Sequence, residues 1–261
     1  MKLHTVPAST GLLWVKLGIR TFVRQPLAMS GLFFLFMAGI SVLTLLPFVG
    51  AALSALLTPA ANLGLMAASK EASAGQFPMP KTLVTAFRNG PDQTRGMLVL
   101  GGLYGLIFLV VMVLASLFDS AAPVTADAAA LTPEAVMQNT LGNPALWVAM
   151  AVMLPLQMLF WHAPALLHWH RVSPVKALFF SAMACWANKG ALLVFMLGWM
   201  GVFVVFGLSL TLLGSLLGGP QAMGVILYPA VLFMASMFFT SIYFVFRDSF
   251  EDAAESDNPV T

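Results

Sequence analysis

The sequence predicts an all-α membrane protein with six transmembrane helices. Of its 261 residues, 60% are hydrophobic and only 8% are charged, whereas soluble domains usually contain about a quarter charged residues. Six uncharged apolar runs each reach the roughly 20 residues that a helix needs to cross a bilayer core. The twelve Lys and Arg residues all fall on one side of the membrane that these runs define, which supports six spans because a count of four would place basic clusters on both sides.

The predicted spans follow one another with short connections. They run from Leu27 to Leu46, Phe48 to Ala68, Met97 to Phe118, Ala145 to Leu167, Ala191 to Leu213 and Met223 to Phe246. The first two come from one apolar stretch, and Pro47 is the expected break because proline lacks the N–H that continues a helix. The chain therefore divides into a cytoplasmic amphipathic segment (1–26), a six-span membrane domain (27–246) and an acidic cytoplasmic tail (247–261).

The basic residues predict the orientation of the chain. Four precede the first span, four lie between the second and third, three lie between the fourth and fifth, and one follows the sixth. Short cytoplasmic loops collect Lys and Arg, so we expect both termini to lie in the cytoplasm. A reporter fused near Ala129 should then read as periplasmic, and one fused after Asp257 as cytoplasmic. The opposite readings would contradict the span count.

Three segments that precede the first, third and fifth spans resemble one another. Each is short and amphipathic, with an aromatic residue followed by a helix-stopping pair: residues 21–26, 85–90 and 185–190. The second helix of each following pair contains one early proline, and these helix-break positions are Pro59, Pro155 and Pro229. The pattern favours three repeated hairpins, each preceded by a cytoplasmic amphipathic helix. Aromatic residues beside basic ones also occur at membrane interfaces without any repeat.

The first of these segments predicts a helix lying in the headgroup plane. Its apolar face consists of Leu12, Val15, Ile19, Phe22 and Val23. Its basic stripe has a spacing of four residues, which places the cations one above another: Lys16, Arg20 and Arg24. We expect the apolar face to sink toward the acyl chains and the stripe to contact anionic lipid headgroups on the cytoplasmic side. The alternative is a docking face for a soluble partner.

Residues that support catalysis or ion coupling are missing from the sequence. No predicted span contains Asp, Glu, Lys or Arg, which weighs against ion-coupled transport. Nucleophile, phosphate-loop and zinc-protease motifs do not occur, so we expect no enzyme, no catalytic residues and no cofactor. The net charge of +2 excludes nucleic acid as a main partner.

Lys189 lies one turn from the single cysteine, Cys185, and would lower the pKa of its thiol, but packing beside Trp186 is the favoured interpretation.

His162, His168 and His170 are the candidates for a haem or metal site. Metal ligands on a helix converge at positions i and i+4. The observed spacing instead places His168 and His170 on different faces from His162, unless Pro164 bends the helix. We therefore expect interfacial histidines and no metal.

Glycines at a spacing of four permit close helix packing in the third span. Gly101 and Gly105 form this small-residue pattern. Packing within the bundle explains it, and an interface with another membrane subunit would give the same pattern.

Two blocks of residues resemble a known family. The first runs from Met1 to Ala8 and continues through Trp14, Gly18, Phe22 and Pro26; the second is Trp161–Leu166, followed by Lys176–Leu178, Ser181, Ala184–Cys185 and Asn188. The chain resembles an uncharacterised family of six-span inner-membrane proteins of betaproteobacteria. It is more distantly similar to the membrane domain attached to some glycerophosphodiester phosphodiesterases, whose catalytic part it lacks. The resemblance implies a fold and a location, with no established activity.

These observations favour a non-enzymatic inner-membrane protein that acts as an accessory or organising component, either as a subunit of a larger membrane complex or as a homo-oligomer. The alternative is a passive carrier or lipid-handling protein with a site between the proline-containing helices. A cavity at Pro59, Pro155 and Pro229 would favour the carrier, and a dry, close-packed bundle would favour the accessory role.

Overall fold

The structure is a computed structural model that describes residues 2–47, 49–118, 133–217 and 220–250. Within these ranges it contains helices and no strands. Six stretches are long and apolar enough to cross a membrane, which confirms the predicted all-α, six-span fold. They are α2 (Pro26–Thr44), α3 (Gly50–Ser73), α4 (Pro91–Leu117), α6 (Pro144–Phe160) continued by α7 (Ala163–Trp169), α9 (Lys189–Leu217) and α10 (Pro220–Phe250).

The other helices lie before or between the spans. Helices α1 (Thr10–Arg24), the 3₁₀ helix η1 (Pro80–Phe87) and α8 (Pro174–Ala187) precede α2, α4 and α9, and α5 (Pro133–Gly142) lies between α4 and α6. Proline stands in the first turn of several helices, where its missing N–H costs no helical hydrogen bond. The predicted tail beyond residue 250 lies outside the described residues, and the cytoplasmic orientation of the termini stays a prediction.

The three predicted helix-break positions are wrong. Pro59, Pro155 and Pro229 lie inside α3, α6 and α10, and each helix continues past its proline. A single proline removes only one hydrogen bond of the helix, and in a membrane helix neighbouring groups readily compensate for it. The prolines therefore do not divide the second helix of each pair.

The fourth span breaks at a different proline. Helix α6 ends at Phe160 and α7 begins at Ala163, so the chain bends at Trp161 and His162. The cause is Pro164, whose ring would clash with the carbonyl of Phe160 four residues earlier and whose nitrogen cannot donate to it. The bend turns α7 toward α3 and α4, against which it packs.

Each surface segment packs against the second helix of a hairpin. Helix η1 packs against α3, α8 packs against α6, and α1 packs against α10 and α9. The three surface segments therefore occupy equivalent positions. Helix α1, the first of the chain, packs against the last pair of spans, α9 and α10. Adjacent hairpins meet where α3 packs on α4 and where α2 packs on α10.

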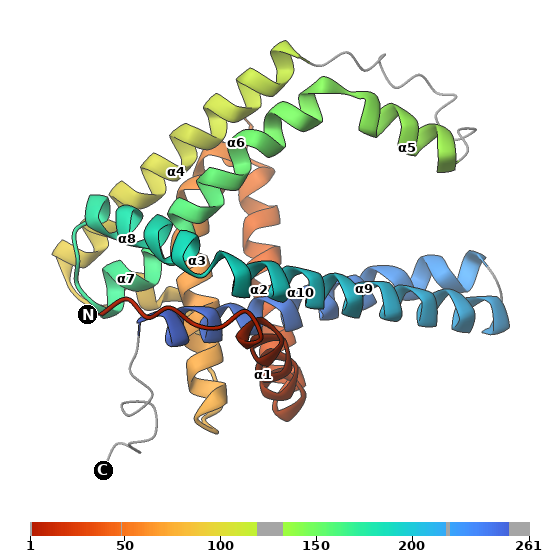
Figure 1. The fold of residues 1–261 in the computed structure, drawn as a ribbon, viewed down its shortest axis with the longest axis horizontal. Coiled ribbons are helices and arrows are strands. Elements are labelled where there is room, and N and C mark those ends of the chain that lie inside the picture. The colour runs from red at the N-terminus through yellow and green to blue at the C-terminus, as the bar shows by residue number, and fades with distance from the viewer. Residues whose placement is uncertain (1, 48, 119–132, 218–219, 251–261) are drawn as a thin grey trace.

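The third junction between hairpins is open. Helices α6 and α9 have no comparable packing among the residues described. Figure 1 shows the α4–α6 pair and the α9–α10 pair diverging from the region of α7 and α8. The bundle is therefore joined at two of the three seams between its hairpins.

Helix α1 buries a different face from the predicted one. Its buried residues are Gly11, Trp14, Val15, Gly18, Thr21 and Phe22. Leu12 and Val23, predicted to share the apolar face with Val15 and Phe22, are 49% and 62% exposed. The face is divided because α9 and α10 cover only part of the helix, so α1 is anchored by protein contacts as well as by any lipid contact.

Two further contacts fix α1 on α10. The indole Nε1 of Trp14 donates a 2.8 Å hydrogen bond to Asp248, whose other carboxylate oxygen accepts from Arg247 at 2.8 Å. A Cβ atom at Gly18 would lie only 2.4 Å from the Cβ of Ser241. The absence of a side chain at Gly18 is therefore what allows the two helices to cross so closely.

The segment before α1 is held by one buried side chain and by a backbone hydrogen bond, in which His4 N–H donates to the carbonyl of Ser249 at 2.9 Å. The backbone N–H of Val6 donates to Asn188 Oδ1 at 2.9 Å, and Asn188 Nδ2 donates to the carbonyl of His4 at 3.0 Å and to Ser249 Oγ at 3.4 Å. The side chain of Asn188 is 2% exposed. It joins the start of the chain, the start of α9 and the end of α10.

The spans pack mainly at the end where α1, η1 and α8 lie, which we call the basal end. Most buried residues of these spans lie near that end. In α2 they fall within residues 28–33, and in α9 they include Ala191, Phe195 and Trp199. Helix α10 is buried mainly from Met234 onward. Side chains nearer the opposite, far end, such as Val42 and Leu117, are 64% and 72% exposed. The apolar surface of the far end is therefore available to lipid or to another protein.

Candidate functional site

Four helices enclose a cavity of about 110 Å³ near the centre of the membrane-spanning region. Its lining comes from α3 (Thr58, Pro59, Asn62 and Met66), α4 (Tyr104), α6 with the residue after it (Gln157, Phe160 and Trp161) and α10 (Phe238, Phe239 and Ile242). Asn62, Tyr104 and Gln157 stand near the middle of their spans. These three polar side chains therefore lie near the middle of the membrane-spanning region.

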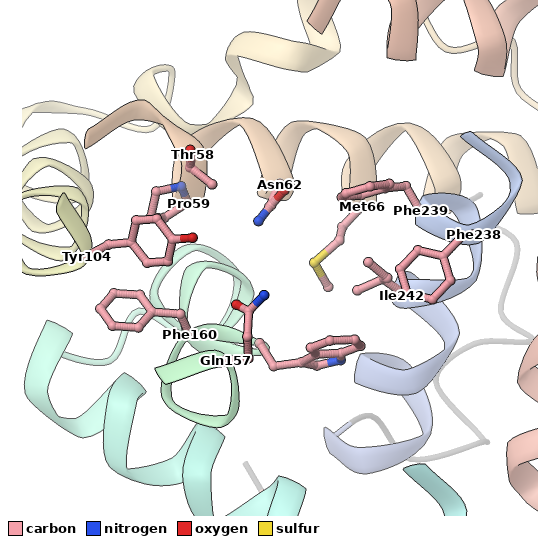
Figure 2. Close-up of a pocket in the computed structure, with 11 residues that line it drawn as sticks. Thr58, Pro59, Asn62, Met66, Tyr104, Gln157, Phe160, Phe238, Phe239 and Ile242 are labelled. Carbon is pink, nitrogen blue, oxygen red and sulfur yellow. The ribbon is translucent and has the colours of Figure 1, made fainter. Parts of the chain in front are cut away.

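Polar side chains from three helices converge on this cavity. Figure 2 shows the amides of Asn62 and Gln157 pointing toward each other across it, with the hydroxyl of Tyr104 directed inward from the side. Neither amide makes a hydrogen bond within the described part of the chain, whereas Thr58 Oγ1 donates to the carbonyl of Ser54 at 2.8 Å. Two amides, each with donor and acceptor groups, are thus available to a molecule in the cavity.

Aromatic rings form most of the remaining wall. Tyr104 packs edge-on against Phe160, with ring centroids 5.1 Å apart, and Phe238 contacts Trp199 and Phe239 in edge-to-face pairs. These contacts hold the lining side chains in defined positions. The cavity thus has fixed apolar walls and a small polar centre, which is the usual composition of a small-molecule site.

The cavity is open on the side of α6. Gln157 is exposed although it lies in the middle of a span, and α6 has no substantial packing against α9 or α10 in the described residues. The opening therefore faces the surroundings of the bundle at membrane depth. A membrane-dissolved molecule would reach the amides without crossing the headgroup region.

The cavity meets the expectation for a carrier site only in part. Pro59 lines it, as predicted, but Pro155 and Pro229 are exposed and do not contribute. Asn62 and Gln157 were recognisable in the sequence as amides deep within spans, although nothing in the sequence showed that they face each other. Tyr104 and the phenylalanines of α10 gave no signal, because aromatic residues are common in membrane helices.

A second, wider cleft of about 460 Å³ opens at the basal end. It is lined by Asn89, Asp92, Gln93, Arg171 and Ser173, together with neighbouring apolar residues. Its charged residues, Asp92 and Arg171, are exposed, so solvent satisfies them. The central cavity, whose amides are surrounded by apolar rings, is the stronger candidate.

The predicted lipid-contacting stripe on α1 lies away from both cavities. Lys16, Arg20 and Arg24 are exposed on the side of α1 opposite its buried face. This position leaves the three cations accessible to headgroups. Contact with anionic lipid stays a prediction.

The bend at Trp161 brings His162 and His170 to the same pair of phenylalanine rings, so the expectation that they lie on different faces is wrong for this pair. His162 is 1% exposed, and its ring contacts those of Phe246 and Phe250, which His170 also contacts. His168 points elsewhere, with Nε2 lying 3.1 Å from the Asn89 side-chain nitrogen. In the part of the chain that the structure describes, no three His, Cys, Asp or Glu side chains are placed to hold a metal ion.

Cys185 is a packed residue. Its thiol is 2% exposed and donates a 3.7 Å hydrogen bond to the carbonyl of Met158. Burial raises the pKa of the Cys185 thiol to about 12. The ammonium of Lys189 lies over the ring of Trp186, 4.6 Å from its centroid. Lys189 therefore does not lower the pKa of the thiol.

We expect Cys185 to resist maleimide labelling in the folded protein. Only the thiolate reacts, and a pKa of about 12 in place of 9.0 leaves the thiol almost fully protonated at pH 9, where an ordinary cysteine is half ionised. Labelling at pH 9 should therefore be at least about a hundredfold slower than in the SDS-unfolded protein. Equal rates in the two states would show that Cys185 is not buried.

One curated relative aligns with nearly the whole chain. The chain is 37% identical over 255 residues to a protein of Burkholderia thailandensis named "probable inner membrane protein", and the alignment covers 96% of this chain and 94% of the relative. No established family profile matches the chain, and no solved structure matches it. The relative's name gives a location and no activity.

Proposed function

This chain belongs to the same family of multi-pass inner-membrane proteins as the Burkholderia protein, and from that premise we propose that it is a non-enzymatic protein that binds a membrane lipid between α3, α4, α6 and α10. The proposal narrows the lipid-handling alternative to one site. The observation that carries it is the pair of facing amides, Asn62 and Gln157, which have no hydrogen-bond partner among the described residues.

The two amides destabilise the bundle as long as they have no hydrogen-bond partner. Asn62 is half-buried and Gln157 is exposed at membrane depth, where the bilayer core offers little water to satisfy their amides. A polar group left without a partner in such apolar surroundings costs about 1–3 kcal/mol. Helix–helix contacts usually solve this problem by pairing such side chains directly. Here the two amides are held on opposite sides of a cavity, so a bound molecule that bridges them would remove the cost.

Retention of lipid through purification tests the proposal. We expect the wild-type protein, extracted in mild detergent, to keep a bound lipid that native mass spectrometry detects. A double variant, Asn62→Leu with Gln157→Met, keeps the side-chain sizes but removes both amides, and it should lose that lipid. Ser209→Ala is a matched control because Ser209 lies in a span, bonds only to its own helix and does not line the cavity. A wild-type protein free of lipid would contradict the proposal.

A second proposal is the accessory role, either within a larger membrane complex or in a homo-oligomer. It is supported by the exposed apolar side chains at the far end, including Leu208 of α9, which is 67% exposed. The same purification tests it, because a stoichiometric partner or a second copy would appear in the native mass. The distant likeness to the membrane domain of glycerophosphodiester phosphodiesterases likewise stays a prediction.

A further inference from the structure

We infer that the cavity between α3, α4, α6 and α10 selects a lipid whose polar part is uncharged and has carbonyl or hydroxyl oxygens, and that it excludes phospholipids. This inference rests on the proposed function and specifies the ligand of the same site. Acylglycerols and quinones share the required chemistry. Charge, hydrogen bonding and size each restrict what the cavity can bind.

Charge excludes a phosphate from the site. Lys, Arg, His, Asp and Glu are all missing from the lining. Two cations follow the lining residues on their helices. Lys70 lies four residues beyond Met66 on α3, and its ammonium is 5.1 Å from the centroid of the Trp169 ring. Arg247 lies five residues beyond Ile242 on α10, and its guanidinium is paired with Asp248 at 2.8 Å. Moving an ionised group from water into apolar surroundings without a countercharge is prohibitively costly. A phospholipid headgroup would therefore find no compensation here.

Hydrogen bonding favours neutral oxygens. The amides of Asn62 and Gln157 each offer N–H donors and a carbonyl acceptor, and Tyr104 adds a hydroxyl. A ligand carbonyl can accept from the amide N–H groups, and a ligand hydroxyl can also donate to an amide oxygen. Because the amides come from α3 and α6, a ligand with two oxygens can bridge the two helices.

Size restricts the site to the polar part of the ligand. A cavity of about 110 Å³ is smaller than the engineered cavity of about 150 Å³ that binds benzene. It therefore takes only the oxygen-bearing edge of the ligand, and the rest of a quinone ring or of an acylglycerol, with its chain, must lie in the opening beside Gln157. The opening beside Gln157 leads to apolar side chains of α6, including Leu154 and Met150, which are 63% and 45% exposed. The chain of the ligand would extend along this surface toward the far end.

Added probes test the inference separately from the retention of native lipid. The purified full-length protein is mixed with dioctanoylglycerol, a short-chain quinone or dioctanoyl phosphatidylethanolamine, and binding is measured by native mass spectrometry. We expect at least one neutral probe to bind the wild type and the Ser209→Ala control. Binding should weaken about fivefold to tenfold in Asn62→Leu and in Gln157→Met, since each loses a hydrogen bond. The two neutral arms distinguish an acylglycerol from a quinone.

Other results overturn the inference in recognisable ways. Phosphatidylethanolamine binding that depends on Asn62 and Gln157 would refute the charge argument while leaving lipid binding intact. Neutral probes that bind equally to the wild type and to both amide variants would place the ligand elsewhere. If neither native lipid nor any probe binds, the proposed function fails as well. Asn62→Ser replaces Asn62→Leu if the latter does not elute as a single species in size-exclusion chromatography.

Discussion

Gly101→Ala should strongly destabilise the protein, whereas Gly102→Ala, one residue away, should be neutral or slightly stabilising. A Cβ atom at Gly101 would lie 2.0 Å from the carbonyl oxygen of Leu56 and 3.0 Å from its carbon, which are backbone atoms of α3 that cannot rotate away. A Cβ at Gly102 would meet no atom within 4 Å. Alanine also favours a helix by about 1 kcal/mol over glycine, so the two substitutions act in opposite directions.

The expected difference between the two variants is at least about 3 kcal/mol, because forcing α3 away from α4 opens the most closely packed pair of spans. Thermal unfolding in detergent, followed by size-exclusion chromatography, measures it. Gly105→Ala should fall between them, since its Cβ would lie at an ordinary 3.6 Å from Ala55. Equal stabilities for Gly101→Ala and Gly102→Ala would show that α3 and α4 do not meet at Gly101, and would favour an interface with another subunit.

Asn188→Leu should release the start of the chain from the bundle. The substitution removes the acceptor for Val6 N–H and the donor to the carbonyl of His4, and leaves both backbone groups without these partners. We expect a loss of about 2–4 kcal/mol, as is typical when a buried hydrogen-bonding partner is deleted. Hydrogen–deuterium exchange should accelerate at Val6, and the thermal midpoint should fall.

Gln76→Leu is the control for this experiment, because Gln76 is an amide residue in an exposed position and its side chain makes no hydrogen bond in the described residues. It should leave both the exchange at Val6 and the thermal midpoint unchanged. Unchanged exchange at Val6 in Asn188→Leu would mean that the contact of α1 with α9 and α10, together with the hydrogen bond from His4 N–H to the carbonyl of Ser249, is enough to fix the start of the chain.

The same two sites show how far sequence reasoning reached. The Gly101 and Gly105 pattern predicted close helix packing, and the structure identifies α3 as the neighbour. Asn188 appeared only as part of the family resemblance, because a single amide at a membrane boundary has no distinctive spacing. The helix breaks were misassigned for a related reason. Four prolines lie within predicted spans and look alike in sequence: Pro59, Pro155, Pro164 and Pro229. Of these four, only Pro164 coincides with a break.

The sequence by itself determined the class of protein, the number of spans and their approximate limits. These properties depend on hydrophobicity summed along about 20 residues and on where charge is absent, and both sums are local. The tertiary structure alone decided which faces meet. The central spans are apolar on all sides, so no polar stripe marks the packed face of each helix. The convergence of Asn62, Tyr104 and Gln157 on one cavity therefore follows from how three helices pack, which local hydrophobicity does not encode.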